Sequence, residues 1–594
     1  MLRTHTCNEL TEKDIGQNVK LCGWVQSRRD HGELIFIDLR DAYGITQVVF
    51  DHEISNQAHS IAEQVRGEYV IQIEGLVRIR PQDTANDKIT TGKIEVLVEK
   101  IQVFNQALTP PFEVSDDINI GEESRLRYRY VDMRRPVMQK ALRMRYRATK
   151  IMRDYLDEQG FVDIETPILT KSTPEGARDY LVPSRVNQGK FYALPQSPQI
   201  FKQILMVSGF DRYYQIAKCF RDEDLRADRQ PEFTQLDVEL SFVEQEDIFI
   251  LFEGLLNKIF KELKAIDIPQ SFKRLSHKEA IERYGSDKPD TRFGMELVDL
   301  SDELKGCGLK VFKEVISLGG KVKAINAKSC ADFSRSKIDA LTEKAKVWGA
   351  KGLAYFVVKA DGVQSPIYKF FTETEVKTIL SKTKAEIGDI VFFCADKTDI
   401  CHNVLGNLRL TLAKEKNLID KNSFDFLWVV DFPLFKYNEE QQRWDSEHHP
   451  FTSFAEEDLD KLNSGDYANI KSRSYDLVIN GIEMASGSIR IHSPKIQKKI
   501  FEIIGITDQE AEKRFGFLLE AFNYGAPPHG GIAIGIDRLM TLFLKSDSIR
   551  DVIAFPKTQR GSCLMTEAPS AIDQAQLNEL ALKLDIIDEE SLSN

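Results

Sequence analysis

The sequence predicts an α+β protein made of several domains. Its 594 residues are enough for three or four domains, at roughly 100–200 residues per domain. Alternating apolar residues predict antiparallel strands near the N-terminus, again at about 213–240, and once more from 424 onward. The Lys-rich, more helical stretch 286–415 interrupts the second strand-rich region. We therefore expect an N-terminal barrel, a larger antiparallel-sheet domain, and an α+β domain inserted into the latter.

The N-terminal residues 1–108 are expected to form an OB-fold barrel. Five short strand patterns occupy 18–104, and a helix-like stretch lies between the third and the fourth. OB-fold barrels bind single-stranded nucleic acid with cations and exposed rings, because every base has a face on which a ring can stack. Arg28, Arg29, Phe36 and Gln47 supply two cations, a ring and an amide. The spacing leaves open whether Phe36 belongs to the core and the arginines are merely solvated.

A linker is expected at 109–135, because two adjacent prolines end the last strand. The stretch 124–153 contains eleven Arg or Lys and one acid. Such density suits a phosphate backbone or an exposed helix face, and the neighbouring barrel favours the phosphate. The net charge of the whole chain is −12, so any binding of a polyanion must be local.

The remaining domain boundaries follow from changes in amino-acid composition and in the predicted secondary structure along the chain. Residues 136–285 and 416–560 are expected to complete one sheet domain around the insertion 286–415, and 561–594 form a C-terminal extension. The sequence has no run of about 18 apolar residues and no apolar segment behind its N-terminal charge, so we expect no membrane association and a cytoplasmic location. The eight cysteines are scattered without C-x-x-C pairs, which indicates reduced thiols.

Three clusters carry candidate chemistry. In the first, Arg221 and Glu223 end a predicted strand, and an arginine at a rigid strand end can bind two phosphate oxygens. In the second, the glycine-rich stretch 531–535 precedes Arg538, but it lacks the P-loop pattern. In the third, Asp476 and Glu483 bracket a strand and a turn, where carboxylates suit Mg²⁺. Pairing of Arg221 with Glu223, and of the two acids with nearby arginines, is the structural alternative.

Together these clusters resemble the signature motifs of class II aminoacyl-tRNA synthetases, in particular the bacterial aspartate-specific branch. Further segments appear in the order of that family: Glu165–Pro167, Ser172–Tyr180, Gln196–Lys202, the insertion 286–415, His448–Thr452 and Gly535–Arg538. The resemblance covers nearly the whole chain. It implies that the larger domain has the class II antiparallel-sheet catalytic fold with a bacterial-type inserted domain.

The resemblance assigns roles to individual residues. Arg221 and Arg538 would bind the α- and γ-phosphates of ATP, with Glu223 as the third catalytic position. The nucleotide would also be contacted by Asp222, Gln230, Glu483, Gly535, Ile536 and Asp537, and Mg²⁺ would be held by Asp476 and Glu483. L-Aspartate would be bound by Glu175, Gln199, Lys202, Asp237, His448, His449 and Arg490. Transfer RNA would be contacted by Arg28, Arg29, His31, Phe36, Gln47 and Glu95.

The implied activity is an aspartate–tRNA ligase that acts as a homodimer. L-Aspartate would attack ATP to form aspartyl-adenylate and pyrophosphate, and the aspartyl group would then pass to the 3′-terminal adenosine of tRNA(Asp). Positioning and cationic stabilisation suffice for this chemistry without a protein nucleophile. Asparagine would be rejected because a neutral amide leaves Arg490 and Lys202 unpaired. His31 resembles the members that also charge tRNA(Asn).

One departure from the family pattern and two competing hypotheses bear on the resemblance. Where the family usually has glycines after the metal-binding glutamate, this chain has Ala485 and Ser486, whose Cβ atoms put the shape of the pocket in question. An RNA-binding protein on a decayed synthetase scaffold is the competing hypothesis, although the phosphate-binding arginines and the metal-binding acids are all present. A paralogue that activates aspartate for amide synthesis should lack the barrel.

Overall fold

The computed structural model describes residues 1–81, 84–173, 177–225 and 228–585. It consists of two compact units, the first formed by 1–145, 225–230 and 543–572, and the second by 146–224, 231–542 and 573–594. The first unit extends to Arg145, inside the long helix α4 (Pro136–Glu158).

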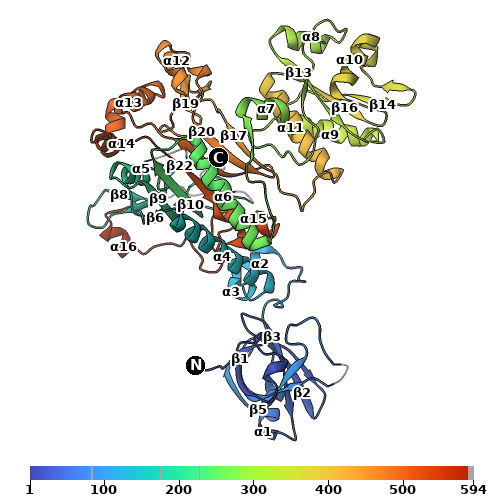
Figure 1. The fold of residues 1–594 in the computed structure, drawn as a ribbon, viewed down its shortest axis with the longest axis vertical. Helices are drawn as coiled ribbons and strands as arrows, with labels where there is room; N and C mark the ends of the chain where they lie inside the picture. Colours follow the sequence, from blue (N-terminus) through green and yellow to red (C-terminus); the bar gives the residue numbers. More distant parts are fainter. Residues whose placement is uncertain (82–83, 174–176, 226–227, 586–594) are drawn as a thin grey trace. The chain divides into compact units, whose positions relative to one another are not determined.

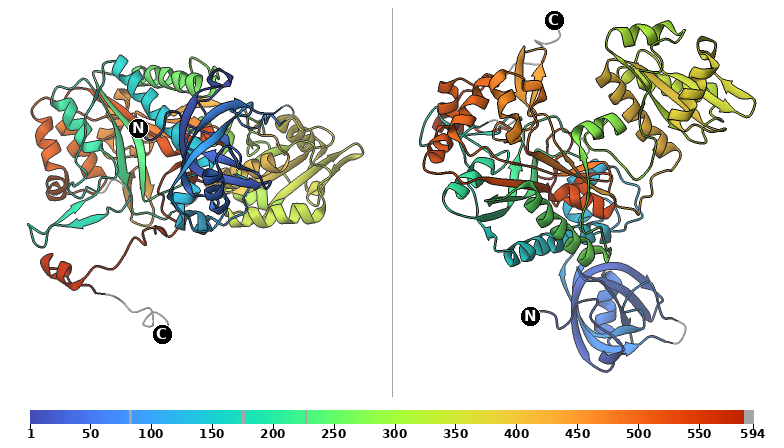
Figure 2. Two further views of the ribbon diagram at one scale, coloured as in Figure 1. Left: turned by 90° about the horizontal axis from the view of Figure 1, so that it is seen from below. Right: turned by 45° about the horizontal axis from the view of Figure 1, so that its top comes forward.

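The first unit contains a closed five-stranded barrel (Figure 2). Its strands pair in the order β1 (Asn18–Asp30), β2 (Leu34–Arg40), β3 (Ile45–Asp51), β5 (Ile94–Asn105) and β4 (Val70–Ile79). Helix α1 (Asn56–Gln64) follows β3 and is capped by Ser55, whose Oγ accepts a hydrogen bond from Ala58 N. Along β2, Ile35, Ile37 and Leu39 are buried in the barrel core. This arrangement confirms the predicted strands and helix.

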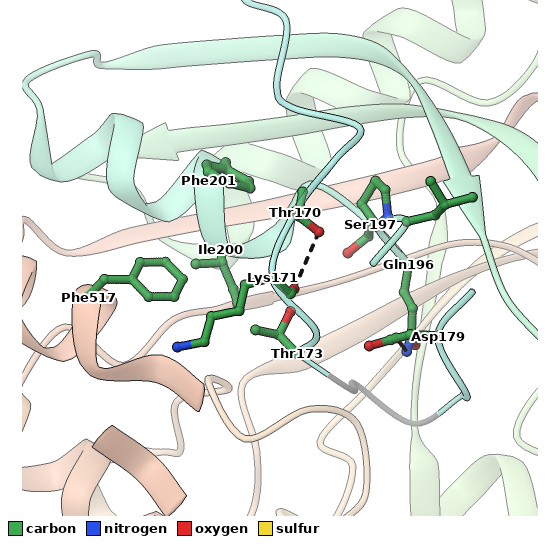
Figure 3. Close-up of a pocket in the computed structure, with 11 residues that line it drawn as sticks. Thr170, Lys171, Thr173, Asp179, Gln196, Ser197, Ile200, Phe201 and Phe517 are labelled. Atoms are coloured by element: carbon green, nitrogen blue, oxygen red, sulfur yellow. Dashed lines mark hydrogen bonds between the residues drawn. The ribbon is translucent and has the colours of Figure 1, made fainter. Parts of the chain in front are cut away.

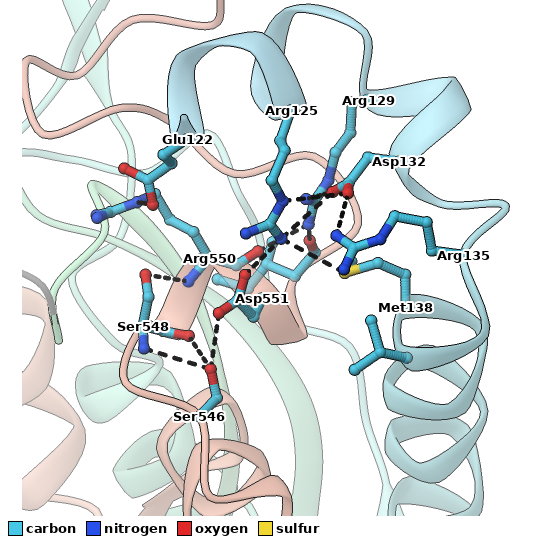
Figure 4. Close-up of polar contacts among 12 residues, drawn as sticks. Glu122, Arg125, Arg129, Asp132, Arg135, Met138, Ser546, Ser548, Arg550 and Asp551 are labelled. Atoms are coloured by element: carbon cyan, nitrogen blue, oxygen red, sulfur yellow. Dashed lines mark hydrogen bonds and ion pairs between the residues drawn. The ribbon is translucent and has the colours of Figure 1, made fainter. Parts of the chain in front are cut away.

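The predicted phosphate-binding role of the arginine run is wrong for Arg125, Arg129 and Arg135, which belong to an ion cluster around one buried carboxylate (Figure 4). Asp132 ends α3 (Arg129–Asp132), is fully buried, and accepts hydrogen bonds from Arg125 of α2 (Glu122–Arg127), from Arg129, and from Arg135. Arg129 also donates to the carbonyl oxygens of residues 550, 553 and 554. These cations are neutralised inside the protein, so they hold the linker to the 3-10 helix Ile549–Val552 instead of meeting a polyanion.

The second unit is built on an eight-stranded sheet (Figure 1). The strand order is β11 (Lys273–Ser276), β17 (Phe426–Val430), β20 (Ser474–Ile479), β21 (Ile482–Ile489), β22 (His529–Gly535), β10 (Glu232–Ser241), β9 (Arg212–Phe220) and β6 (Val162–Asp163). All neighbours are antiparallel except the two edge pairs β11–β17 and β6–β9. Helix α6 (Gln245–Lys264) packs against β22, and α5 (Gln199–Val207) packs against β10. The two halves predicted to flank the insertion therefore contribute to one sheet.

The residues predicted as an insertion form a separate five-stranded sheet. Its order is β12 (Val298–Asp299), β13 (Lys321–Ala327), β16 (Ile390–Asp396), β14 (Ala354–Lys359) and β15 (Gly362–Gln364). Helix α7 (His277–Tyr284) precedes this region, and its own helices are α8 (Lys310–Ser317), α9 (Arg335–Val347), α10 (Glu373–Thr383) and α11 (Thr398–Glu415). Phe392 and Leu405 are among the residues of its apolar core.

The remaining elements are short. They are the hairpins β7 (Leu181–Pro183) with β8 (Phe191–Ala193) and β18 (Phe435–Asn438) with β19 (Arg443–Ser446), and the helices α12 (Leu459–Ser464), α13 (Pro494–Ile503), α14 (Asp508–Phe522), α15 (Ile536–Leu544) and α16 (Gln574–Glu579). Among the described residues, none of the helices has the length and apolar character needed to span a bilayer.

Candidate active site and nucleic-acid interface

One face of the eight-stranded sheet carries most of the polar side chains predicted for the catalytic site. Asp476 lies opposite Ser486, Ser486 opposite Ala533, and Ala533 opposite Asp237. Directly opposed residues of antiparallel strands project from the same face, so Asp476 and Asp237 stand in one row across four strands. Glu239 lies two residues beyond Asp237 on β10, on the same face. Strand register thus brings together acids that are far apart in the chain.

A β-bulge turns Glu483 toward the face that carries Asp476. The pairing of β20 with β21 shifts between Leu477 and Val478, so that Val478 lies opposite Glu483 instead of Met484. A regular hairpin would place the Glu483 side chain on the other face of the sheet, because a shift of one residue inverts every side chain. The bulge is a feature that the sequence pattern did not reveal.

Four charged side chains form the end of the site predicted to bind the amino acid. Lys202 Nζ of α5 lies 2.5 Å from Asp237 Oδ1 and 3.2 Å from Glu239 Oε2. Arg490 donates from Nε to Glu239 Oε1 at 2.9 Å and from Nη2 to Glu239 Oε2 at 3.1 Å. All four are at most 2% exposed. The sequence pattern places Glu239 two residues from Asp237 on the same predicted strand, but it does not predict a binding role for Glu239.

The protein holds the two acids of this cluster differently. Burial raises the pKa of Asp237 even though Lys202 opposes the shift. Burial also acts to raise the pKa of Glu239, but Arg490 and Lys202 outweigh it and hold that pKa at about 2. Asp237 Oδ2 has no hydrogen-bond partner in the described part of the chain. An orphaned buried carboxylate oxygen beside an ammonium and a guanidinium is suited to a ligand that carries both signs of charge.

The two predicted histidines differ in electrostatics. His449 Nε2 lies 2.6 Å from Arg490 Nη1, and burial together with Arg490 puts the pKa of His449 well below its usual range, so it is a neutral acceptor. His448 Nε2 lies 3.7 Å from Asp476 Oδ1. Burial lowers the pKa of His448, but Asp476 more than compensates and the net shift is upward. His448 therefore faces the predicted metal site and His449 the predicted amino-acid site.

Gln199, the other described aspartate candidate, starts α5 and donates to Gln203 Oε1 at 3.1 Å. Gln203 in turn contacts His529 Nε2 at 3.1 Å, so the polar row continues to β22. Glu175 lies outside the described residues. A pocket on this unit is lined by Lys171, Asp179, Gln196, Ile200, Phe517 and neighbouring residues (Figure 3). None of the four charged residues of the amino-acid cluster lines it.

The predicted phosphate-binding arginines each follow the end of a strand that pairs with the first residues of β10, Arg221 after β9 and Arg538 after β22. Arg538, in the first turn of α15, donates from Nη1 to the carbonyl of Glu483 at 2.6 Å. Arg221 follows β9, its guanidinium lies 5.0 Å from the centre of the Phe233 ring, and its buried Nε has no hydrogen-bond partner among the described residues. Phe233 therefore orients a guanidinium that still has capacity for a ligand.

Several nucleotide-site candidates also have structural roles. Asp537 Oδ2 accepts from Thr234 N at 2.8 Å, and Ile536 is fully buried, so neither side chain is turned to a ligand. Gln230 exchanges two hydrogen bonds with the main chain of Lys557, at 2.8 and 3.0 Å. Asp222 N donates to the carbonyl of Arg178 at 3.1 Å. Glu223 follows Asp222 directly, and Gly535 ends β22 opposite Gln235.

The acids at the phosphate end fit a magnesium ion. Burial and the neighbouring Asp476 raise the pKa of Glu483, against opposing effects of Arg538 and Lys288. Asp476 Oδ1 is buried without a hydrogen-bond partner in the described residues. Mg²⁺ typically takes one or two protein carboxylates and completes its shell with water and phosphate oxygens. Two adjacent carboxylates with an unpaired oxygen meet that requirement.

Ala485 and Ser486, which stand where the family usually has glycines, project from opposite faces of the sheet. Ala485 is 2% exposed and lies opposite Leu477 and Ile534, on the side of the sheet away from Asp476. Only Ser486 stands in the row of Asp476. The doubt about the shape of the pocket therefore concerns one hydroxymethyl group and not two extra side chains.

The barrel carries a polar network on one outer face. Arg29 lies opposite Phe36 on β2, and Asp38, two residues further, lies opposite Gln47 on β3. Arg29 donates to both Asp38 and Gln47 at 3.1 Å, and Gln47 donates to Glu95 at 2.8 Å. Phe36 points away from the core residues of β2, which removes the alternative that it is a core side chain. A half-buried ring on the outer face of the barrel, beside an amide and a cation, is suited to a stacked base.

His31 and Arg28 differ in their relation to this face. The exposed His31 ring packs edge-on against Phe36, with centroids 5.7 Å apart. Arg28 lies opposite Ile37, whose side chain points into the barrel, and donates to Ala62 O at 3.0 Å and to Asp30 at 2.5 Å. The structure thus groups His31 with Phe36 and separates Arg28 from Arg29.

Known proteins match this chain over nearly its full length. Residues 121–559 match the family model described as tRNA synthetases class II (D, K and N), and 19–104 match the OB-fold nucleic acid binding domain. The aspartate–tRNA(Asp/Asn) ligase of Anoxybacillus flavithermus is 56% identical over 583 residues, covering 98% of both chains. The enzyme of the same name from Geotalea uraniireducens is 55% identical over 581 residues, also covering 98% of both.

Solved structures of similar fold include two synthetases. The asparaginyl-tRNA synthetase from Pyrococcus horikoshii, complexed with asparaginyl-adenylate, has a TM-score of 0.58 at 19% identity and covers 94% of this chain and 99% of its own. The aspartyl-tRNA synthetase from Entamoeba histolytica has a TM-score of 0.56 at 20% identity and covers 92% of this chain and 90% of its own. These two likenesses concern the fold.

Proposed function

This chain belongs to the class II tRNA synthetases of the D, K and N group, and from that premise we propose that it is an aspartate–tRNA ligase. The enzyme activates L-aspartate with ATP and transfers the aspartyl group to tRNA(Asp). One observation carries the choice of amino acid: Lys202 and Arg490 converge on one buried cluster, where an anionic side chain can pair with both. A neutral or cationic side chain would leave these cations without a ligand.

The amino-acid end is organised before substrate arrives. Glu239 fixes the plane of the Arg490 guanidinium through two hydrogen bonds. Arg490 Nη1, which His449 and Ser488 contact, and Lys202 Nζ would receive the side-chain carboxylate of aspartate. Asp237, with its unpaired Oδ2, would accept hydrogen bonds from the α-ammonium together with Gln199 and Glu175. This order leaves the α-carboxylate as the group available for attack.

The phosphate end supplies positive charge where the reaction develops negative charge. Arg221 would bind the α-phosphate and Arg538 the γ-phosphate, with Asp222, Glu223, Gln230 and the backbone of 535–537 around the nucleotide. Mg²⁺, held by Asp476 and Glu483, would neutralise phosphate charge. Fixed cations of this kind stabilise the charge that spreads over the phosphate oxygens during in-line displacement.

The barrel would select the tRNA. Phe36 would stack on an anticodon base, Gln47 and Glu95 would contact base edges, and Arg29 would hold a phosphate, while the internal contacts of Arg28 make its phosphate role the weaker one. His31 packs on the Phe36 ring, and relatives with 54–56% identity are named for both tRNA(Asp) and tRNA(Asn). We therefore extend the proposal to charging of tRNA(Asn).

A homodimer in the cytoplasm completes the proposal. The segment Glu165–Pro167 lies between exposed apolar side chains, namely Val162 (47%), Ile168 (42%) and Leu169 (52%). A cluster of exposed apolar residues around one segment is typical of an interface. Charging of tRNA serves translation, which places the enzyme in the cytoplasm.

The test is aspartate-dependent exchange of labelled pyrophosphate into ATP. We expect exchange with aspartate, none with asparagine or lysine, and loss of exchange in Arg221→Ala and Arg538→Ala. Charging of purified tRNA(Asp) and tRNA(Asn) then measures the second specificity. Folded protein that binds tRNA without any exchange would refute the ligase in favour of an RNA-binding protein.

A further inference from the structure

The chain segment that leaves α7 for the inserted sheet is held in a fixed path. Gly285 ends α7 with a φ of +68°, and a Cβ there would collide with the carbonyl of His402 in α11. Arg409 of α11 is 1% exposed and donates from Nη2 to the carbonyls of Asp290, Phe293 and Gly294 at 2.7, 2.9 and 3.1 Å. Its guanidinium also lies 4.0 Å from the centre of the Phe293 ring. The segment 285–294 is therefore bound tightly to α11.

The same segment packs against the turn that precedes Glu483. A Cβ on Gly481 would lie 2.9 Å from Cβ of Asp290, so these two residues touch, and the positive φ of +76° at Gly481 belongs to that turn. Asp290 is 4% exposed and binds Arg292 through both of its carboxylate oxygens, at 3.0 and 2.7 Å. Thr291 donates to the carboxylate of Asp425, which lies just before β17. The segment is thus anchored to the turn of the hairpin β20–β21 and to the residue that precedes the neighbouring strand β17.

Because the segment 285–294 is anchored in this way, Lys288 lies at the phosphate end of the site. Its Nζ lies 3.9 Å from Glu483 Oε2, and no second ion pair of Lys288 is found in the described part of the chain. The Lys288 side chain is 48% exposed and that of Glu483 37%, so both border open space. Arg538 binds the carbonyl of the same Glu483. Two cations therefore flank the acid that we assign to Mg²⁺.

We propose that Lys288 is a further substrate-binding residue, which binds the β- and γ-phosphate oxygens of ATP and the pyrophosphate product. The inference deepens the proposed function and rests on it. Glu483 would hold Mg²⁺, and the ammonium of Lys288 lies 3.9 Å from that carboxylate at the border of open space, where it would meet phosphate oxygens bound beside Glu483. A lysine suits this place because its compact charge on a flexible stem can follow phosphate oxygens as the bond to the α-phosphate breaks.

The test compares the binding of pyrophosphate and of AMP, each with Mg²⁺, by isothermal titration calorimetry. We expect Lys288→Ala to weaken pyrophosphate binding about tenfold, the loss of one charge-assisted contact, and to leave AMP binding unchanged. Lys288→Arg should keep pyrophosphate affinity within about threefold of the wild type. In the exchange assay Lys288→Ala should raise the KM for ATP and for pyrophosphate, with the KM for aspartate unchanged.

Lys305→Ala is the matched control. Lys305 lies in the same inserted region, is 62% exposed and pairs with Asp302, so its removal takes away one positive charge without touching the site. An unchanged pyrophosphate affinity in Lys288→Ala, or an equal loss in Lys305→Ala, overturns the role of Lys288 while leaving the ligase intact. Wild-type protein that shows neither exchange nor pyrophosphate binding overturns both proposals.

Discussion

Two buried ion clusters in this protein use the same residue types for opposite purposes. Around Asp132, three arginines share one carboxylate. Arg129 also donates hydrogen bonds to three carbonyl oxygens of the segment 550–554. Around Glu239, Arg490 and Lys202 share one carboxylate, but among the described residues Arg490 Nη1 contacts only a neutral histidine and a hydroxyl. The Asp132 cluster is closed, and the Glu239 cluster retains capacity for a ligand.

A buried charged group indicates a binding site only when one of its hydrogen-bond donors or acceptors has no partner within the protein. Asp237 Oδ2, Asp476 Oδ1 and Arg221 Nε are buried atoms without hydrogen-bond partners among the described residues, and all belong to the proposed substrate sites. The density of charge in the sequence does not distinguish a closed ion cluster from a binding site. Three arginines of the most arginine-rich stretch, Arg125, Arg129 and Arg135, are bound inside the Asp132 cluster.

Asp132→Ala should have the largest effect, on stability. Three arginines would be left buried around an absent carboxylate, and removing one partner of a buried ion cluster costs about 3–5 kcal/mol. The measurements are the free energy of unfolding in urea and, separately, the rates of amide hydrogen exchange in the linker helices α2 and α3. Asp154→Ala is the control, because its exposed pair with Lys150 should contribute at most about 0.5 kcal/mol. A loss as small as that of the control would show that the cluster is not structural.

Glu239→Gln should cost stability in a manner that depends on pH. The folded pKa of Glu239, about 2, lies below its ordinary value of 4.5, so its ionised form stabilises the fold. That contribution, on the order of 3 kcal/mol, is complete above pH 4.5 and is lost as the pH falls from 4.5 toward 2. Thermal melting of both proteins from pH 7 to pH 3 should show the difference shrinking as the pH falls. A gap that is constant across this range would contradict the assignment.

Arg490→Lys should affect binding more than stability. A lysine can still pair with Glu239, but it loses the two-pronged contact and the Nη1 donor, which we expect to cost about 2–3 kcal/mol of aspartate binding. The readout is the KM for aspartate in pyrophosphate exchange. Arg129→Lys in the Asp132 cluster is the counterpart, and it should lower the melting temperature without changing that KM. If both variants raise the KM for aspartate alike, the contrast between the clusters fails.

Phe36→Ala extends the contrast to the barrel face and should have the smallest effect. Loss of one stacked base should weaken tRNA binding by about 1–3 kcal/mol, with the rate of pyrophosphate exchange unchanged. Phe36→Tyr keeps a ring and should restore most of the affinity. The measurement is the charging KM for tRNA(Asp). Equal charging by Phe36→Ala and the wild type would exclude stacking on this ring.

Much of the architecture was predictable from local pattern. The alternation of Ile35, Ile37 and Leu39 with outward residues predicts a barrel strand, and the structure buries these three side chains. The motif residues Lys202, Asp237 and Arg490 were identified from segments that are continuous in sequence. Glu239, Lys288 and Arg409 were not, because their partners are distant along the chain and the pairing becomes visible only in the folded protein.

The sequence by itself determined the order of the domains, the strand-forming segments and the family to which the chain belongs, because hydrophobic periodicity and motif spacing are local properties. Only the tertiary structure decided that a bulge after Leu477 turns Glu483 toward Asp476, and that the arginines around Asp132 are neutralised inside the protein. Strand register and burial depend on contacts between distant segments. They determine which charges remain available to a ligand.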